Sequence, residues 1–400
     1  MAKITKQSDN FSKWYTDVIL DADLADYGPV KGTMVVKPYG FSLWTNIRDS
    51  LNKMIEDSGH DNAYFPLFIP KSFLEKEAKH VEGFAKECAV VTHSKLISEE
   101  GSLTVDPESK LEEEIIVRPT SETIIWHMFK KWITSYRDLP LKVNQWANVV
   151  RWEMRTRLFL RTSEFLWQEG HTAHATKEEA MKETLEIVEI YRTLFEDYLA
   201  IPTIIGRKSN LERFAGADET FSIETMMRDK KALQAGTSHY LGTNFGSAFD
   251  VKFQSKDNKE HPVYATSWGV STRMVGALIM VHGDDKGLKI PPKIAPTQVV
   301  IVPINPKKEK SEEFSSFVMK VEEKLTYLDI RTHIDDLDES PGFKFNKWEL
   351  KGVPIRIEIG LKEFENMEVT VCRRDNSEKY QIQIDKIDEI PTILQSIQDN

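Results

Sequence analysis

The stretch from Val149 to His171 combines basic, acidic and aromatic residues at spacings that could support chemistry. It reads as a strand, an exposed basic loop and a return strand. Because residues two apart on a strand point to the same face, Arg151 and Glu153 would present a cation beside an anion. The return strand would place four further side chains on one face: Phe165, Trp167, Glu169 and His171. Two apolar rings beside a carboxylate and an imidazole are costly to bury unless a ligand binds there.

An ordinary surface hairpin would explain the Arg-x-Glu tripeptide alone, which is common in proteins. The pattern here is longer, because Arg-x-Glu is followed by a basic loop and then by Arg-x-x-x-Phe-x-x-x-Glu between Arg161 and Glu169. In this form it resembles motif 2 of the class II aminoacyl-tRNA synthetases. The elements on either side therefore have to supply the other motifs of that class.

Two segments upstream could help to position this hairpin. Residues 41–59 carry apolar side chains at helical spacing, and a short strand follows at residues 63–70. Taken alone, they predict a buried amphipathic helix and a strand. The order helix, strand and Pro66 also resembles motif 1, which forms the dimer interface of class II synthetases. Residues 95–114 are polar and acidic with glycine and proline, which predicts an exposed, mobile loop.

Thr120, Ser121 and Glu122 stand where a strand is expected to end and a helix to begin. An N-capping hydroxyl followed by an acid in the first turn is ordinary helix chemistry. An acid held at such a junction could also receive a substrate ammonium group. The T-x-E sequence resembles the loop that prolyl and related class II enzymes use for that purpose.

A glycine-rich segment follows the helix predicted at residues 177–198. Its members are Gln234, Gly236, Thr237, Ser238, His239 and Gly242. The segment is too polar and too rich in glycine for a core strand, and its small residues would let the backbone approach a ligand closely. A lone histidine is usually structural, but one inside GTSHYLGTNF indicates a binding site. Phe214 lies between the two segments, before a glycine–alanine turn.

The last candidate segment is residues 268–282. Gly269 and Ser271 are expected to open an apolar helix, with Arg273 in its first turn. The helix dipole disfavours a cation there. A solvated surface arginine would explain the placement, and so would a bound anion or an aromatic base against the guanidinium. Gly-x-x-x-Arg at the start of an apolar helix resembles motif 3.

From Leu288 the composition changes. Residues 289–296 are a proline-rich connector, and residues 297–400 alternate strands and helices as a small α/β domain without a catalytic constellation. Arg373 and Arg374, at a strand end, would either contact a polyanion or form a solvated basic pair.

The overall composition describes an ordinary protein of 400 residues with a net charge of −10. Its two cysteines, Cys88 and Cys372, are too few for a zinc site built from thiolates, so no protein-held metal is expected. The N-terminus has no apolar signal core, and no window approaches the roughly 18 apolar residues of a membrane helix. These features predict a cytoplasmic protein without a membrane partner. The negative charge argues mildly against nucleic-acid binding, although a local basic surface suffices for it.

The three motifs and the segments RPTSET, LWQEGHTAH, ERFAGADET and AGTSHYLGTNF together resemble the prolyl-tRNA synthetases over essentially the whole chain. The interval from Arg161 to Arg273 is too short for the editing insertion of the bacterial type, so the resemblance is to the archaeal and eukaryotic-like type. Relatives of this type continue into a further, often zinc-binding domain. An end at Asn400 therefore suggests a truncated or reduced variant.

This resemblance implies an α+β fold. Residues 1–288 would be a class II aminoacyl-tRNA synthetase catalytic domain with a mainly antiparallel β-sheet flanked by helices. Residues 289–296 would be a linker, and residues 297–400 a C-terminal α/β anticodon-binding domain.

The resemblance also implies a reaction: the chain would activate L-proline with ATP and Mg²⁺ and transfer it from prolyl-adenylate to tRNA-Pro, as a homodimer formed through motif 1. Arg151 and Arg273 would be catalytic. The residues implied for ATP binding are Arg151, Glu153, Arg161, Thr162, Phe165, Gln234, Thr237, Ser271, Thr272 and Arg273. The residues implied for proline binding are Thr120, Ser121, Glu122, Arg151, Trp167, Glu169, His171, Phe214, His239 and Ser271.

Two alternatives stay open on the sequence. A threonyl or seryl synthetase would share the three motifs, although these segments lack the cysteine that threonine recognition uses as a zinc ligand. A non-catalytic synthetase-like protein that binds RNA or a partner would be free to lose Arg151, Glu153 or Arg273, and all three are present.

Overall fold

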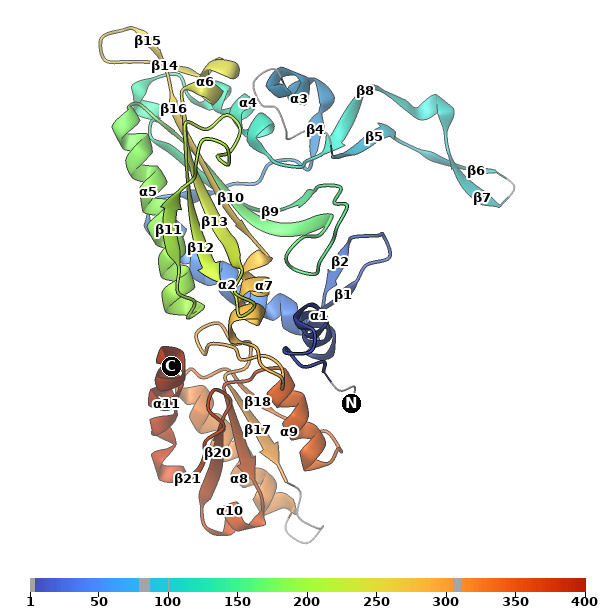
Figure 1. Cartoon of the computed structure of the whole chain (residues 1–400), viewed down its shortest axis with the longest axis vertical. Coiled ribbons are helices and arrows are strands. Elements are labelled where there is room, and N and C mark those ends of the chain that lie inside the picture. The colour runs from blue at the N-terminus through green and yellow to red at the C-terminus, as the bar shows by residue number, and fades with distance from the viewer. Residues whose placement is uncertain (1–3, 79–86, 100, 305–310) are drawn as a thin grey trace.

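The larger part of the molecule is built on a seven-stranded sheet (Figure 1). The computed structural model describes residues 4–78, 87–99, 101–304 and 311–400. In sheet order the strands are β11 (Ile204–Arg207), β12 (Glu219–Met226), β13 (Ala232–Gly242), β16 (Tyr264–Ser271), β10 (Glu164–His174), β9 (Leu141–Val150) and β3 (Asp61–Asn62). β3 runs parallel to β9, and the other neighbours are antiparallel. The expected mainly antiparallel sheet is confirmed.

Helices flank this sheet, as expected. They are α1 (Phe11–Asp21), α2 (Pro38–Asp57), α4 (Glu122–Trp132), α5 (Lys177–Thr193), α6 (Asn244–Ala248) and α7 (Arg273–His282). α5 packs on β12, β13 and β16, and its Tyr191 is hydrogen-bonded at 2.7 Å to the side-chain amide of Gln168 in β10. Because side chains alternate along a strand, the odd-numbered residues of β10 point to the opposite face. That face is the one a ligand can reach.

α2 corresponds to the amphipathic helix expected at residues 41–59. It packs against α5 and buries Trp44, Ile47 and Leu51 at helical spacing. Its first helical residue is Pro38, a position where the missing N–H costs no hydrogen bond. The shorter elements nearby are β1 (Ala25–Tyr27) paired with β2 (Met34–Val36), and β14 (Lys252–Gln254) paired with β15 (Glu260–Pro262).

An arm projects from the body and ends in the β6–β7 hairpin (Figure 1). The elements are α3 (Lys71–Ala78), a sheet of β4 (Phe68–Pro70), β8 (Lys110–Val117) and β5 (Ala89–His93), and a hairpin of β6 (Leu96–Glu99) and β7 (Ser102–Val105). The prediction of a loop over residues 95–114 is therefore wrong for these strands, while residue 100 lies outside the described residues. Paired backbone groups satisfy one another without a core, so a polar composition does not exclude a hairpin.

Two further local predictions are wrong. Residues 232–242 form β13, near the centre of the sheet, although they were expected to be too polar for a core strand. Gln234, Thr237 and His239 of this strand line a pocket. On the α5 side of the sheet Gly236 is needed, because a Cβ would lie 2.8 Å from Val270 and 3.1 Å from Tyr191. Gly269 and Ser271 belong to β16 instead of opening a helix, since β16 pairs on both sides, and α7 begins at Arg273.

The C-terminal part has a five-stranded sheet with the order β18-β17-β19-β20-β21 and its own apolar core. The strands are β17 (Val299–Pro303), β18 (Thr332–Ile334), β19 (Ile355–Ile359), β20 (Glu368–Arg373) and β21 (Lys379–Gln383). The helices are α8 (Ser311–Tyr327), α9 (Pro341–Leu350), α10 (Leu361–Glu365) and α11 (Ile390–Asp399). The expected α/β alternation is confirmed, although β21, α10 and α11 were not anticipated. Among the described residues, no helix combines the length and apolar character needed to cross a membrane.

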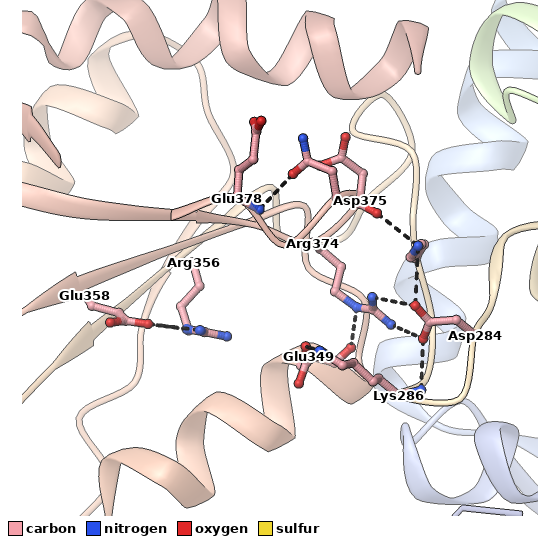
Figure 2. A network of polar contacts seen from close by, with 10 residues as sticks. Asp284, Lys286, Glu349, Arg356, Glu358, Arg374, Asp375 and Glu378 are labelled. Atoms are coloured by element: carbon pink, nitrogen blue, oxygen red, sulfur yellow. Dashed lines mark hydrogen bonds and ion pairs between the residues drawn. The ribbon is translucent and has the colours of Figure 1, made fainter. Parts of the chain in front are cut away.

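The basic pair Arg373 and Arg374, at the end of β20, is not a free surface. Arg374 is only 6% exposed and forms an ion pair at 2.6 Å with Asp284, a residue 90 positions earlier (Figure 2). Arg373 pairs with Asp375 at 2.7 Å. Neither a solvated basic pair nor a polyanion contact by Arg374 fits this arrangement, because a buried guanidinium requires an anionic partner inside the protein.

Candidate active site

A pocket of about 330 Å³ opens on the face of the large sheet opposite α5. Thirteen of the residues singled out from the sequence line it: Thr120, Glu122, Arg151, Phe165, Trp167, Glu169, His171, Phe214, Gln234, Thr237, His239, Ser271 and Arg273. They come from segments more than 150 residues apart. Strand pairing and two helix starts bring them together.

The strand register sets the pocket floor. Across β10, β16 and β13, His171 lies opposite Ser267 and Ser267 lies opposite His239. The next row joins Glu169, Gly269 and Thr237 in the same way. Side chains in such rows stand about 5 Å apart, so polar groups from three strands converge on one ligand-sized space.

A buried acid lines the pocket. Glu122 is the first residue of α4 and is 5% exposed; the unpaired N–H groups of a helix N-terminus stabilise an anion there. Its carboxylate accepts a short hydrogen bond from the Thr120 hydroxyl. Ser121 is fully buried, accepts a hydrogen bond from Gln145 at 3.2 Å and does not line the pocket.

A buried ion pair lies beside this acid. Glu169 accepts hydrogen bonds from Gln145 at 2.9 Å and from His171 Nε2 at 3.1 Å. Burial raises the pKa of Glu169, but the hydrogen bonds from His171, Ser121 and Gln145 outweigh it and hold the pKa below its usual value. Burial lowers the pKa of His171, and Glu169 more than compensates, so that pKa is raised. His171 Nδ1 is buried without a hydrogen-bond partner among the described residues.

A stacked pair of rings forms another wall. Phe214 and His239 stack with centroids 4.6 Å apart and an interplanar angle of 29°. His239 Nδ1 lies 3.0 Å from the hydroxyl of Thr220. Burial, then the nearby Lys208 and His171 charges, lower the pKa of His239 to about 3. Its ring is therefore neutral at pH 7 and offers a flat, weakly polar surface.

Two arginines supply positive charge. Arg151 donates from Nε to the Pro119 carbonyl at 2.8 Å, and its guanidinium lies over the rings of Phe165 and Trp167, 5.6 and 5.3 Å from their centroids. Burial lowers the pKa of Arg151, and the charges of Glu122, Glu169 and Glu153 oppose that shift. The cation is thus held on aromatic faces within reach of several carboxylates.

Arg273 stands at the first position of α7. It donates to the carbonyls of Leu160 and Gln234, each at 3.4 Å. Burial lowers the pKa of Arg273, and repulsion from Arg161 and Arg151 lowers it further. Two guanidinium groups that repel each other across one pocket make an anion between them favourable.

Five of the residues that the resemblance implies for catalysis or ligand binding do not line the pocket. Ser121 is buried, and Glu153 forms an ion pair with Arg161 at 2.7 Å. The other two are buried hydroxyls: Thr162 donates to the Glu164 carbonyl at 2.6 Å, and Thr272 has no hydrogen-bond partner for its hydroxyl among the described residues.

The pocket also contains residues that the sequence did not single out: Lys208, Glu212, Thr220, Ala235, Ser267, Trp268 and Val270. Gly236 and Gly269, named in the sequence as parts of the glycine-rich segment and of the motif 3 pattern, line it as well. Lys208 makes a short hydrogen bond to the side chain of Gln234. Lys208 and Glu212 stand in the same polar segment as Phe214, so that segment was a usable signal. Thr220 and Ser267 carry no local signal, because only the strand register brings them to the pocket.

Comparison with known proteins gives two family matches. Residues 104–282 match the tRNA synthetase class II core domain (G, H, P, S and T), and residues 298–393 match the anticodon binding domain. The proline–tRNA ligase of Flavobacterium johnsoniae is 56% identical over 400 residues, covering 99% of this chain and 81% of the relative. The same enzyme of Cytophaga hutchinsonii is 56% identical, covering 100% of this chain and 82% of its own length.

A solved structure is similar as well. The crystal structure of prolyl-tRNA synthetase from Cryptosporidium parvum, complexed with halofuginone and AMPPNP, aligns with a TM-score of 0.92 and 41% identity. The alignment covers 99% of this chain and 78% of that chain.

Proposed function

The chain belongs to the proline–tRNA ligase family, and on that premise we propose how its pocket divides the reaction among named residues. The function is ATP-dependent ligation of L-proline to tRNA-Pro. In its first step the carboxylate of proline attacks the α-phosphate of ATP, giving prolyl-adenylate and pyrophosphate. Both reactants are anions, so charge neutralisation and alignment dominate the barrier.

Arg151 and Arg273 neutralise those anions. The observation that carries this assignment is that both guanidinium groups line the same pocket. Arg151 bridges the α-phosphate and the proline carboxylate, while Arg273 engages the γ-phosphate and lies against the adenine. Phe165 stacks on the other face of the base, and Gln234, Thr237 and Ser271 are placed on the pocket wall to reach ATP.

The motif 2 residues Glu153, Arg161 and Thr162 are engaged in contacts within the protein. Glu153 would accept from the adenine amino group, yet it is held by Arg161 at 2.7 Å. That ion pair has to be exchanged for contacts with the nucleotide if both residues bind it. Thr162 and Thr272 would act by supporting the loop and the start of α7, because both side chains are buried.

The acidic end receives the amino acid. Glu122, with Thr120, binds the secondary ammonium of proline, since a buried carboxylate at a helix start is suited to a cation. The pyrrolidine ring lies among the remaining side chains of this end: Trp167, Glu169, His171, Phe214 and His239. The neutral, stacked His239 favours an apolar ring over a charged side chain.

Mg²⁺ would accompany ATP and would need few protein ligands, because this ion is usually held by one or two carboxylates together with substrate phosphates and water. One observation supports this arrangement. In the pocket, Glu122 and Glu169 are already engaged by Thr120 and by His171. The ion would supply further charge neutralisation for the phosphates.

Residues 1–288 form the catalytic domain, residues 289–296 the linker and residues 297–400 the domain that binds the anticodon stem. The separate apolar core of the C-terminal sheet supports this division. The archaeal and eukaryotic-like architecture is supported by the short interval between Arg161 and Arg273, although the relatives in Flavobacterium and Cytophaga are bacterial.

We also propose a homodimer formed through residues 44–66, the motif 1 region. Large apolar side chains are exposed in and next to it: Phe41 is 46%, Tyr64 74% and Phe68 49% exposed. A subunit interface at this region would bury these rings. Light scattering at micromolar concentration should give twice the chain mass, and a monomer mass would contradict the proposal.

Proline-dependent pyrophosphate exchange tests the pocket assignment. Arg151→Ala should lower the exchange rate by at least about 100-fold, or roughly 3 kcal/mol of transition-state stabilisation. Arg137→Ala is the control, because Arg137 is exposed and outside the pocket. Exchange near the wild-type rate in a folded Arg151→Ala protein would refute the assignment.

A further inference from the structure

The turn directly after α7 joins the two parts of the molecule. Residues 283–287 close on themselves, because Asp284 N–H donates to the Gly287 carbonyl at 2.9 Å and Gly287 N–H donates back at 3.1 Å. Figure 2 shows the Asp284 carboxylate of this turn facing Arg374, which extends from the end of β20 in the C-terminal part. The turn therefore lies between the two sheets.

Arg374 forms a bidentate ion pair with this carboxylate through both terminal nitrogens. Nη1 donates to Asp284 Oδ2 at 2.9 Å and Nη2 to Oδ1 at 2.6 Å. Its Nε donates to the Glu349 carbonyl at the end of α9, at 2.9 Å. All three sides of the guanidinium are thus engaged. Burial raises the pKa of Asp284, but Arg374 outweighs it and lowers the pKa to about 2, so the pair stays charged at neutral pH.

Other contacts converge on the same turn. Lys289 lies 3.3 Å from Asp284 and also donates to the Asp375 carbonyl at 2.9 Å. Lys286 pairs with Glu349 at 2.9 Å. From the N-terminal side, Trp14 of α1 donates from its indole N–H to the Asp284 carbonyl at 2.9 Å. The turn is therefore fixed from three directions.

This turn is mechanically connected to the pocket by α7. The helix starts with Arg273 in the pocket wall and ends at His282, one residue before the turn. Its residues from Met274 to Met280 are all buried. A ten-residue helix spans about 15 Å as a stiff element, so α7 sets the position of Asp284 relative to the pocket.

We propose that the Asp284–Arg374 pair is a positioning device: it fixes the orientation of the C-terminal domain relative to the pocket, so that tRNA held by that domain places its acceptor end at the adenylate. Arg374 is then a positioning residue for the transfer step. The proposal rests on the tRNA charging assigned under the proposed function. It assigns Arg374 no contact with RNA.

The chemistry of the pair is suited to fixing the angle between the two domains, and not only to holding them together. Apolar contacts are non-directional and would hold two surfaces together over a range of angles. A bidentate arginine–carboxylate pair has one preferred plane and direction. Burying charges is also a poor way to gain stability, because desolvation offsets most of the attraction. A small angular error at the junction would be magnified at the far end of a bound tRNA.

The experiment compares Asp284→Asn, Arg374→Lys, Arg374→Gln and the double variant Asp284→Asn/Arg374→Gln with the wild-type chain. Arg356→Lys is the matched control, since Arg356 pairs with Glu358 inside the C-terminal domain at 2.9 Å. Three quantities are measured: pyrophosphate exchange with proline and ATP, the Kd for a tRNA-Pro transcript, and kcat for charging that transcript.

We expect exchange within about 2-fold of wild type and an unchanged Kd, but a charging kcat lowered roughly 10- to 100-fold, since a misplacement near 1 Å is enough for such a loss. The double variant should charge no worse than Arg374→Gln, because both remove one interaction. Arg374→Lys should have an intermediate charging kcat, since lysine keeps the positive charge but cannot form the bidentate contact of a guanidinium group.

An unchanged charging kcat in Asp284→Asn would overturn the proposal. So would equal losses in exchange and charging, which would make the pair a support of the catalytic fold. A weakened Kd with unchanged kcat would show that Arg374 contacts RNA and would also overturn it. If the wild-type chain lacks exchange, the proposed function itself fails, and this outcome is distinct from the others.

Discussion

Replacing Glu122 by Gln should separate proline binding from folding. Glu122 is 5% exposed, begins α4 and accepts a hydrogen bond from Thr120. Glutamine has the same shape, and its amide oxygen can still accept from that hydroxyl. The substitution removes the negative charge that we propose binds the ammonium group of proline.

The magnitude follows from the kind of contact removed. A hydrogen bond to a charged group is worth about 1.5–3 kcal/mol, so KM for proline should rise roughly 10- to 150-fold. The effect on stability should be small. The helix N-terminus loses an anion worth about 0.3–1 kcal/mol, while a buried amide is easier to desolvate than a carboxylate. A net change within about 1 kcal/mol corresponds to a Tm shift of about 4 °C or less.

Pyrophosphate exchange at varied proline and at varied ATP provides the assay, with thermal melts in parallel. KM for ATP should change much less than KM for proline, because the proposed nucleotide contacts do not include Glu122. Glu178→Gln is the control: Glu178 is also an acid in the first turn of a helix, but it is exposed and lies outside the pocket.

A folded Glu122→Gln protein with unchanged KM for proline would refute the role of Glu122 as the ammonium acceptor. A parallel rise in KM for proline and ATP would indicate a general distortion of the pocket. A loss of several kcal/mol in stability would show that the carboxylate has an internal structural partner instead.

Gly170→Ala should destabilise the protein by roughly 1–3 kcal/mol through overpacking, because its Cβ would lie 2.1 Å from ring carbons of Trp268; Gly206→Ala, with open space around it, should leave the Tm unchanged. The Glu169–His171 pair predicts a pH dependence that thermal melts of wild type and Glu169→Gln can measure. Because the pKa of Glu169 is lowered in the folded protein, its ionised form stabilises the fold above pH 4.5, and this stabilisation is lost as the pH falls through the folded-state pKa. Because the pKa of His171 is raised, its protonated form stabilises the fold below pH 6.5, and this stabilisation is lost as the pH rises through the folded-state pKa. The Tm difference between the two proteins should therefore be largest between pH 4.5 and 6.5, and a constant difference would contradict the assignment. Alanine should be activated measurably in exchange assays, since each missing methylene gives only about 1–3 kcal/mol of discrimination. Pre-charged Ala-tRNA-Pro should not be hydrolysed by the enzyme. Rapid enzyme-dependent hydrolysis would show an editing site that we do not expect.

Local signals in the sequence determined much of the fold and the positions of many candidate residues. Alternation in residues 165–171 places their aromatic, acidic and imidazole side chains on one face of β10, and apolar spacing at residues 41–59 marks α2. The T-x-E segment lies where β8 gives way to α4, as expected. These signals work because periodicity and capping are decided within a few residues of the chain.

The tertiary structure decided what depends on partners distant in the chain. Residues 232–242 form a strand only because β12 and β16 pair with them and because Gly236 fits beneath Tyr191. Register alone brings Thr220 and Ser267 to the pocket. Arg374 looks like a surface cation in the sequence, yet Asp284, 90 residues away, makes it a buried junction contact. Strand partners and buried ion pairs are selected by the packing of the whole chain, and no window of neighbouring residues contains that information.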